Sequence, residues 1–425
     1  MSIKLGELND YLELAEECTI PLQEPEAPKG EVQLRTREEV AALKKQAKEE
    51  RAKPERAEIS LQDCLACSGC ITSAEAVFVQ SQGGARFMQV LTDNVEAGFR
   101  PVVSIAPQSL VSLAVHYNLP HAEVFSKLSA FFKTNGAELV STNEGQAEAL
   151  RDFIREFEQL APEQLPLVVS SCPGFVCVCE KQNPEVLPKM SRVGSPMAYT
   201  AAWVHSTRPE GTKHLSIQPC FDRKLESARP EFQPGAATEV VISPFELVDV
   251  ISDKLGVDSL ESVESDSVAV DPVPEGVSGN YGEHLCAHYG VSNSEWRPKR
   301  RGNPDFTVSE AELPMKGGPT RVMLYKAYGA RNIYNVTRMV RTRGERAVIE
   351  AMACPGGCVM GGGQCPAPDS VGHKTFAGMV HDAWDKLEVA GLDGVRHSEV
   401  VRQTFIDHVE TAKDATTATM AQLQW

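Results

Sequence analysis

The chain has 425 residues and a formal net charge of −16, with 24% charged and 42% hydrophobic residues. This composition is typical of a folded protein with two or three domains, and the acidic balance argues against nucleic acid as a partner. Because no stretch of about eighteen apolar residues is present, the sequence also predicts no membrane span.

The N-terminal residues are polar and acidic and lack the apolar core of a signal peptide, so we expect the protein in the reducing cytoplasm. Disulfides are disfavoured there, and the twelve cysteines are better explained by metal binding. The spacing of these cysteines therefore indicates where the chemistry of the protein lies.

Residues 1–95 are predicted to form an N-terminal segment that holds a ferredoxin-like cysteine loop. Three thiols follow CxxCxxC spacing in this segment, Cys64, Cys67 and Cys70. Such a loop can bind three corners of a four-iron cluster, and in bacterial ferredoxins a fourth cysteine follows four residues later. That position is Ala74 here, so the fourth ligand comes from elsewhere, and Cys18 is the nearest unassigned thiol. A zinc ion on four thiolates is the alternative, although zinc motifs usually consist of two separated CxxC pairs.

From about residue 95 the pattern changes to alternating strands and helices, which predicts a first α/β lobe over residues 96–256. The short apolar or β-branched runs lie at 101–106, 138–141, 165–170, 214–218 and 239–243. Helix-length amphipathic segments lie between them, at 122–134, 146–160 and 245–255. This alternation is typical of a mostly parallel sheet covered on both faces.

Residues 257–318 are rich in Ser, Glu, Gly, Pro and Asp and are predicted to form an irregular insertion. The short basic run at 297–301 falls in it and indicates a solvated loop rather than a nuclear signal or a phosphate-binding patch. A second α/β lobe is expected over 319–412, followed by a tail at 413–425. The terminal Trp425 is either a chance residue of that polar tail or a docking residue for a partner.

The second lobe has a simple predicted order of elements. Strands are expected at 321–326 and 346–352, and helices at 332–341, 374–390 and 400–412. The glycine-rich cysteine loop at 353–364 follows directly on the second of these strands.

Three cysteines directly follow predicted strands. Cys172 follows the run at 165–170, Cys220 follows 214–218, and Cys354 follows 346–352, with Cys358 four residues later across a Pro-Gly-Gly turn. In open α/β sheets, sites form beyond the carboxyl ends of strands, so we expect the three strands to bring these thiols to one sheet edge. Four thiolates that converge in an apolar interior match a [4Fe–4S] cluster. The alternative is a structural glycine turn that carries incidental cysteines.

Four other cysteines lack this placement and are predicted to be packing residues. They are Cys177, Cys179, Cys286 and Cys365.

The cysteine segments at 170–197, 217–226 and 353–364 resemble the three cysteine signatures of the iron-only ([FeFe]) hydrogenase catalytic domain. Their form is similar to that of the hydrogenase-like proteins of the prelamin A recognition factor (NARF-like) family, which includes cytosolic iron–sulfur protein assembly factors. The resemblance extends over nearly the whole chain, and the Ser-Ile-Ala-Pro stretch at 104–107 is a further specific match.

This resemblance implies an α/β fold in which two lobes with mainly parallel sheets surround a buried cluster, plus an N-terminal iron–sulfur segment. It implies two [4Fe–4S] clusters as cofactors. The first would be held by Cys18, Cys64, Cys67 and Cys70, and the second by Cys172, Cys220, Cys354 and Cys358.

The function implied is that of a non-enzymatic carrier in cytosolic iron–sulfur protein assembly, which passes clusters to client proteins in the cytoplasm and nucleus. The implied partners are a targeting complex with a WD-repeat propeller protein, and upstream P-loop scaffold ATPases. The terminal residue of the family, here Trp425, would dock the targeting complex. Gln424 stands where the family usually has an acidic residue, so weaker docking is expected.

Departures from the hydrogenases argue against hydrogen chemistry, and no catalytic residue is assigned. Hydrogenases have a proton-relaying cysteine at the position of Ser171, a Met at Gln218 and a Lys at Arg223, although Lys224 is adjacent. A serine hydroxyl does not titrate near neutral pH and relays protons less well than a thiol. Two alternatives remain: a redox enzyme with a modified or di-iron cluster bridged through Cys358, and a nuclear prelamin-binding protein.

Overall fold

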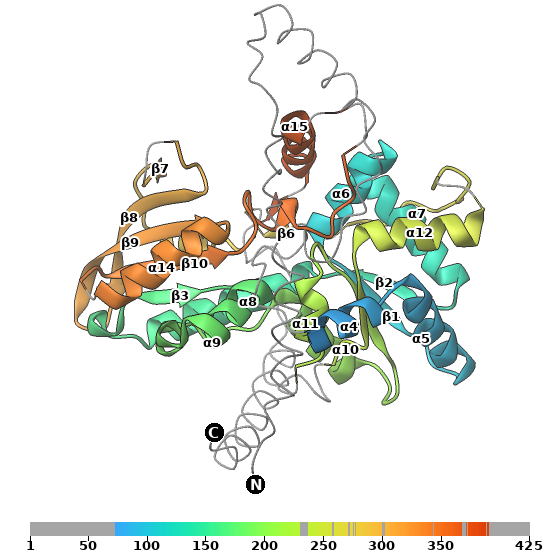
Figure 1. Cartoon of the computed structure of the whole chain (residues 1–425), viewed down its shortest axis with the longest axis horizontal. Helices are drawn as coiled ribbons and strands as arrows, with labels where there is room; N and C mark the ends of the chain where they lie inside the picture. Colours follow the sequence, from blue (N-terminus) through green and yellow to red (C-terminus); the bar gives the residue numbers. More distant parts are fainter. Residues whose placement is uncertain are drawn as a thin grey trace, which may run out of the picture. The chain divides into compact units, whose positions relative to one another are not determined.

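Two large β-sheets and one two-stranded sheet, with helices between and around them, make up the part of the chain that the computed structural model describes (Figure 1). The description covers residues 73–390 except 230–236, 257–258, 271–272, 275, 277, 300–301, 343, 368–370, 372 and 388. The expectations for Cys18, the CxxCxxC loop, a helix at 400–412 and Trp425 therefore lie outside the described residues.

The first sheet, sheet A, is fully parallel, with the strand order β2-β1-β4-β5. Its strands are β1 (Val102–Ile105), β2 (Glu138–Ser141), β4 (His214–Ile217) and β5 (Val240–Ile242). In the register, Val102 lies opposite Glu138 on one side and His214 on the other. The parallel α/β arrangement predicted from these runs is confirmed.

Four helices cover one face of sheet A. They are α5 (Gly84–Glu96), α6 (Pro107–Tyr117), α7 (His121–Thr134) and α12 (Pro244–Leu255). Their apolar side chains, such as Phe87 and Leu110, share one core with Val103 and Leu215 of the sheet. Helix α10 (Pro196–Thr207) contacts β1 and β4.

The second sheet, sheet B, is mixed and has the order β3-β10-β9-β8-β7. Its strands are β3 (Leu167–Val169), β7 (Arg297–Pro298), β8 (Phe306–Met315), β9 (Gly318–Tyr328) and β10 (Ala347–Met352). The strands β3, β10 and β9 are parallel, whereas β8 returns antiparallel to β9 in a hairpin. Helix α14 (Ala330–Thr342) packs on β9 and β10.

Helix α8 (Asn143–Glu158) links the two sheets. Its residues Leu150, Phe153, Ile154 and Phe157 recur at helical spacing and lie in the core of sheet B. On another side of the helix, Ala149 packs with Ala198 and Ala202 of α10, which contacts sheet A.

The remaining elements are short. The helices are α4 (Ser73–Ser81), α9 (Pro173–Gln182), α11 (Asp222–Ser227), α13 (Tyr281–His288) and α15 (His373–Trp384). The 3-10 turns η2 (Pro162–Gln164), η3 (Pro184–Lys189) and η5 (Cys358–Met360) and the parallel strand pair β6 (Val273–Pro274) and β11 (Val389–Ala390) complete the set. Within the described ranges, no helix is both long and apolar enough to cross a bilayer.

The strand at 167–169 differs from expectation, because it was predicted within the first lobe and belongs to sheet B. It pairs with β10, about 180 residues later, with Val168 opposite Ile349. Both strands are buried on both faces. Which of two parallel sheets an apolar run joins is decided by tertiary packing, which local sequence patterns do not encode.

Two further segments differ from expectation. The region 257–318, predicted to be irregular, contains α13 and the long strand β8, whose buried residues Phe306, Val308, Ala311 and Leu313 follow mostly alternate positions. The predicted helix at 374–390 ends at Trp384, and residues 389–390 form strand β11 instead, since they pair with β6. The division into domains at 95, 256, 318 and 412 stays a prediction.

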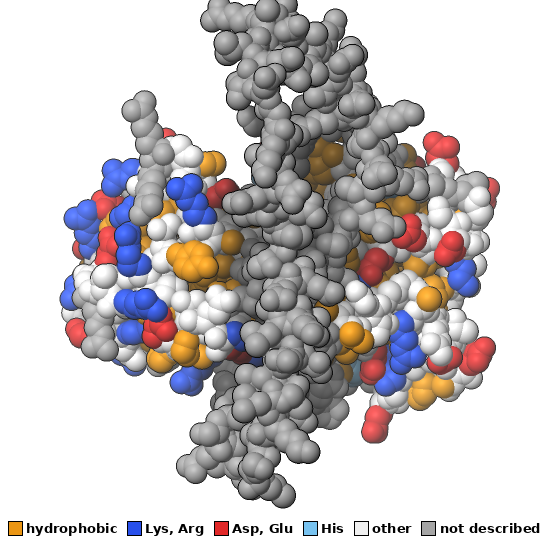
Figure 2. Space-filling view, viewed as in Figure 1, with side chains coloured by type: hydrophobic (Ala, Val, Ile, Leu, Met, Phe, Trp, Pro, Cys, Tyr) orange, Lys and Arg blue, Asp and Glu red, His pale blue; other side chains and the backbone are white. Residues whose placement is uncertain are grey.

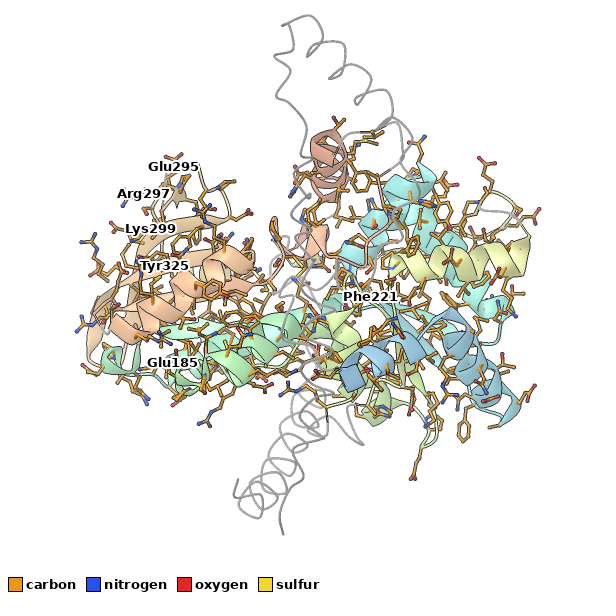
Figure 3. The ribbon with its side chains drawn as sticks, viewed as in Figure 1. Glu185, Phe221, Glu295, Arg297, Lys299 and Tyr325 are labelled. Atoms are coloured by element: carbon orange, nitrogen blue, oxygen red, sulfur yellow. The ribbon has the colours of Figure 1, made fainter. Side chains whose placement is uncertain are left out.

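The basic run at 297–301 begins at the exposed edge strand β7 of sheet B. Lys299 Nζ donates a hydrogen bond of 2.8 Å to Tyr325 Oη and lies 5.0 Å from the centre of its ring. Figure 3 shows Arg297, Lys299 and Tyr325 together on the sheet B side, apart from Phe221. Basic and acidic side chains are interspersed on the visible face of the described residues (Figure 2).

The contact between α8 and α10 leaves no room for a side chain at Gly145. A Cβ there would lie 2.3 Å from the carbonyl oxygen of Pro196 and 2.4 Å from Oγ1 of Thr200. We expect Gly145→Ala to lower the free energy of unfolding by about 1–3 kcal/mol, because a backbone carbonyl cannot move aside as a side chain can. Chemical denaturation monitored by circular dichroism measures this change.

The matched control is Gly378→Ala in α15, where a Cβ would meet nothing within 4 Å. An alanine in an open helical position is expected to leave stability unchanged or raise it by up to about 1 kcal/mol. Equal unfolding midpoints for the two variants would contradict the close helix contact at Gly145.

Candidate metal centre

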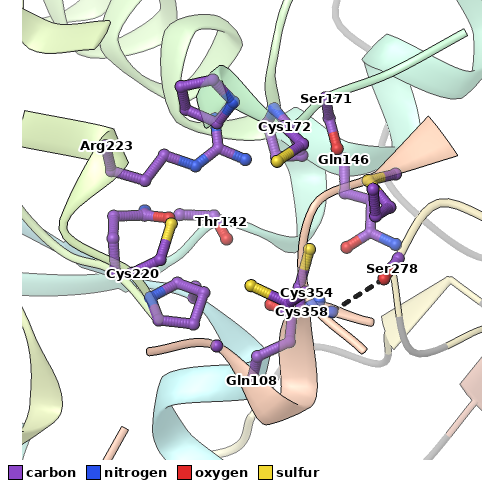
Figure 4. A pocket seen from close by; sticks show the side chains of 17 residues that line it. Gln108, Thr142, Gln146, Ser171, Cys172, Cys220, Arg223, Ser278, Cys354 and Cys358 are labelled. Carbon is purple, nitrogen blue, oxygen red and sulfur yellow. Dashed lines mark hydrogen bonds between the residues drawn. The ribbon is translucent and has the colours of Figure 1, made fainter. Parts of the chain in front are cut away.

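Four cysteines line one pocket where the carboxyl ends of strands from both sheets meet (Figure 4). Cys172 follows β3 and caps the N-terminus of α9. Cys220 lies between β4 and α11, Cys354 follows β10, and Cys358 begins η5. The expectation that all these thiols lie at the edge of one sheet is wrong, because β3 and β10 belong to sheet B and β4 belongs to sheet A. That these four residues are metal ligands stays a prediction.

The loop between Cys354 and Cys358 owes its shape to glycines and to two polar anchors. Gly356 and Gly357 have φ angles of +74° and +80°, a region that other residues rarely adopt. The N–H of Gly356 donates to Oδ1 of Asp305 at 2.8 Å, and the N–H of Cys358 donates to Oγ of Ser278 at 2.9 Å. The loop is therefore held before any ligand binds.

The segment after Cys358 touches the segment that carries Cys220. The N–H of Gly363 donates to the carbonyl oxygen of Pro219 at 2.9 Å. A Cβ at Gly361 would lie 2.3 Å from the same oxygen. The two glycines thus let the cysteine segments of the two sheets approach each other to backbone contact.

Burial raises the pKa of all four thiols. It raises the pKa of Cys172 to about 12, and the nearby Cys358 and Asp222 add to the effect of burial. The charge of Arg223 acts the other way and lowers the pKa of Cys220 and Cys358. These groups are therefore neutral thiols at pH 7 unless a bound cation holds them as thiolates.

Hydrogen-bond donors also face this pocket. Sγ of Cys172 accepts a hydrogen bond from the N–H of Phe175, in the first turn of α9. Of the described residues that line the pocket, Gln146 and Arg223 each bury a donor without a partner, Nε2 and Nε respectively. An unpaired buried donor is costly, and an anionic group with acceptor atoms would satisfy both. Four thiols with these donors fit a sulfide-containing iron cluster.

Residues at which this chain differs from the hydrogenase signatures line the pocket. Ser171 lines the pocket, and its hydroxyl hydrogen-bonds Tyr281. Gln218 lines the pocket as well. Lys224 cannot replace a pocket lysine, because its Nζ is engaged by Glu246, at 2.6 Å, and by the carbonyl of Gln82.

The other cysteines lie elsewhere. Cys179 and Cys286 are in the core of sheet B and Cys365 is in the core of sheet A, as packing residues would be, and Cys177 is half-buried. Among the described residues, no three Cys, His, Asp or Glu side chains are grouped as a single metal ion requires. Figure 4 shows the four pocket sulfurs around a shared space.

Some pocket residues were missed by the sequence analysis. Thr142 and Gln146 follow strand β2 and line the pocket, and the same strand-end rule that selected the cysteines could have found them. Ser278, which lines the pocket, and Asp305, which holds the cysteine loop, come from the segment that was predicted to be irregular, and no sequence signal marks them.

The chain is similar to known proteins over most of its length. Residues 100–362 match the family model described as the iron only hydrogenase large subunit, C-terminal domain. Cytosolic iron-sulfur assembly component 3 of Bos taurus is 34% identical, over 88% of this chain and 86% of that protein. Protein NAR1 of Arabidopsis thaliana is 34% identical over 85% and 83%, and the cytosolic Fe-S cluster assembly factor narfl of Xenopus tropicalis is 32% identical over 99% and 94%.

Solved structures share the fold. An [FeFe]-hydrogenase of Chlamydomonas reinhardtii superposes with a TM-score of 0.56 over 73% of this chain and 89% of that one, at 20% identity. The two-lobed arrangement of mainly parallel sheets expected from the sequence is thereby confirmed.

We expect Gly361→Ala to weaken metal binding at the pocket, because a Cβ would push the segment after Cys358 away from Pro219. The iron content of the anaerobically purified protein should fall by up to about half if the pocket holds one of two clusters. Gly344→Ala is the control, since its Cβ would meet only one atom, at 3.9 Å. Unchanged iron in Gly361→Ala would show that this approach is not needed for binding.

Proposed function

We propose that this protein binds iron–sulfur clusters and carries them during the assembly of other iron–sulfur proteins. The premise is that the chain belongs to the cytosolic iron–sulfur assembly branch of the iron-only hydrogenase-like proteins. One observation carries the proposal. Four thiols from two sheets, that of the buried Cys172 and those of the half-buried Cys220, Cys354 and Cys358, face one space beside two buried donors that lack partners.

In this proposal Cys172, Cys220, Cys354 and Cys358 hold a [4Fe–4S] cluster. The cluster supplies the positive charge that keeps these buried sulfurs ionised. Since the thiols come from both sheets, the bound cluster also ties the two sheets together.

A second [4Fe–4S] cluster is proposed at the N-terminal set, which lies outside the described residues. The support for it is the CxxCxxC spacing of Cys64, Cys67 and Cys70, with Cys18 as the fourth ligand by family resemblance. We propose that this cluster is the one gained and passed on, whereas the pocket cluster is retained, because burial restricts exchange.

The partners in this role would be a cytosolic targeting complex with a WD-repeat propeller subunit and upstream P-loop scaffold ATPases. Trp425 would dock the former. The relatives are named as cytosolic assembly components, and we propose the cytoplasm as the location, with client proteins there and in the nucleus.

A hydrogenase-type redox enzyme is the second candidate, since the fold is that of [FeFe]-hydrogenases. The pocket chemistry speaks against it: the position of the relaying cysteine holds Ser171, whose hydroxyl is engaged with Tyr281. Hydrogen uptake with an artificial electron acceptor, or infrared bands of metal-bound CO and cyanide, would favour the enzyme over the carrier.

Replacing one pocket cysteine should remove one cluster. We expect Cys354→Ala to lose about half of the iron and sulfide and to unfold at lower temperature, because three buried thiols then lack a complete metal site. Iron and sulfide analysis with electron paramagnetic resonance measures the loss.

The control is Cys286→Ala, a buried cysteine of the sheet B core away from the pocket, which should keep its iron. Cys64→Ala should lose the other half of the iron while the thermal transition of the described fold stays nearly the same. Equal iron in Cys354→Ala and the wild type would refute the ligand assignment.

If the protein acts in cluster assembly, its depletion should affect many iron–sulfur enzymes at once. Depletion of the protein should lower the activities of cytosolic and nuclear iron–sulfur enzymes, with mitochondrial ones as the internal reference. Re-expression of wild type or Cys286→Ala should restore them, and Cys358→Ala should not. Normal cytosolic activities after depletion would rule out the assembly role.

A further inference from the structure

One face of strand β4 is polar although it is completely buried. His214 and Ser216 have no exposed surface and Gln218, just after the strand, is 3% exposed. The alternate residues Leu215 and Ile217 face the apolar core of sheet A. Buried polar side chains destabilise a fold unless they are hydrogen-bonded, and apolar residues would serve a purely structural strand.

The polar residues form a continuous chain of hydrogen bonds. Gln218 Nε2 donates to Oγ of Ser216 at 2.8 Å. The hydroxyls of Ser216 and Ser104, on the adjacent strand β1, are 2.8 Å apart. Ser104 Oγ lies 2.9 Å from Nε2 of His214, and Nδ1 of His214 lies 3.0 Å from Oγ1 of Thr238. We call these five side chains the relay.

In one direction of donation, Ser216 and Ser104 each both accept and donate within the relay. In this direction Ser216 accepts from Gln218 and donates its one hydrogen to Ser104, and Ser104 donates its hydrogen to Nε2 of His214. A neutral imidazole then carries its proton on Nδ1 and donates to Thr238. Burial and the nearby His205 on α10 lower the pKa of His214 to about 3, so the ring is neutral at pH 7.

One end of the relay opens into the metal centre. Gln218 lines the pocket of the four cysteines, two residues before Cys220. An amide nitrogen has two hydrogens, and the relay uses one of them. The other end, at His214 and Thr238, is buried beneath α10, where His205 Nε2 meets the carbonyl of Ala237 at 2.8 Å.

We propose that Gln218 donates its second amide N–H to the cluster held by the four thiols, and that the relay is a positioning network that holds the amide in this orientation. This inference rests on the proposed function, because it requires a cluster at these thiols. Hydrogen bonds to cluster sulfur raise the reduction potential, since they stabilise the additional negative charge of the reduced state. The relay thus makes the potential of a buried cluster depend on side chains of the sheet interior.

The first test needs no metal. In the metal-free full-length protein with ¹⁵N-labelled histidine, the signal assigned by its absence in His214→Gln should show protonated Nδ1 and unprotonated Nε2. The opposite tautomer would overturn this direction of donation, because Ser104 would then accept from the ring and Ser216 would no longer pass on the hydrogen bond that it accepts from Gln218.

The second test measures the pocket cluster in the anaerobically reconstituted full-length protein. Gln218→Leu and Ser104→Ala should both lower its midpoint potential in a redox titration followed by electron paramagnetic resonance, with Gln218→Leu giving the larger shift. The H₂O-to-D₂O shift of its Fe–S stretching bands in resonance Raman spectra should decrease in both. Ser126→Ala, which removes a hydroxyl on α7 that is 5% exposed, is the control and should match the wild type.

The outcomes separate the levels of the inference. A shift in Gln218→Leu with none in Ser104→Ala would overturn the positioning role of the relay, and no shift in either would overturn the contact of Gln218 with the cluster. If the wild-type protein holds no iron at the four thiols, the proposed function itself is wrong. Iron analysis of the wild type tests this before any variant is compared.

Discussion

The centre of this structure is governed by the cost of ionising four thiols that are shielded from water. Burial raises the pKa of all four, and among the described residues that line the pocket Arg223 is the one arginine. A protein interior tolerates clustered thiolates only where positive charge is supplied at the same place. The fold has assembled the sulfur atoms but left most of the balancing charge to a ligand, which explains why cluster binding and folding would be coupled.

The second constraint is that the thiols come from two sheets that share no strand. Backbone contacts at Gly361 and Gly363 bring the segments together, and Asp305 and Ser278 hold the loop of Cys354 and Cys358. Helices α8 and α10 close the same region, since Gln146 and Pro196 line the pocket. The site thus depends on close packing of elements that are distant in sequence, and small residues are used where backbones must touch.

Much of the fold and the pocket cysteines could be predicted from local patterns. The strands of sheet A are short apolar runs, and Cys172, Cys220 and Cys354 follow strands, where parallel sheets place functional residues. The partner strand of β3 could not be predicted, because an apolar run does not indicate which of two sheets it joins. The alternation of Phe306, Val308, Ala311 and Leu313 in β8 was a usable signal, hidden by the Ser- and Glu-rich composition around it. The polar relay was not predictable, since Ser104 and Ser216 meet only through the register of β1 and β4.

The pairing of β3 with β10 has a consequence for the order in which the nascent chain can fold. All strands of sheet A have been synthesised by residue 242, whereas sheet B needs β10, which ends at residue 352. At ribosomal rates, the intervening stretch of about 110 residues takes roughly 5–20 s. During that interval β3 lacks its partner strand β10, and the loop that completes the pocket of Cys172 and Cys220 has not yet been synthesised. A cluster held by the four thiols, as proposed, could therefore be inserted only after most of the polypeptide has been translated.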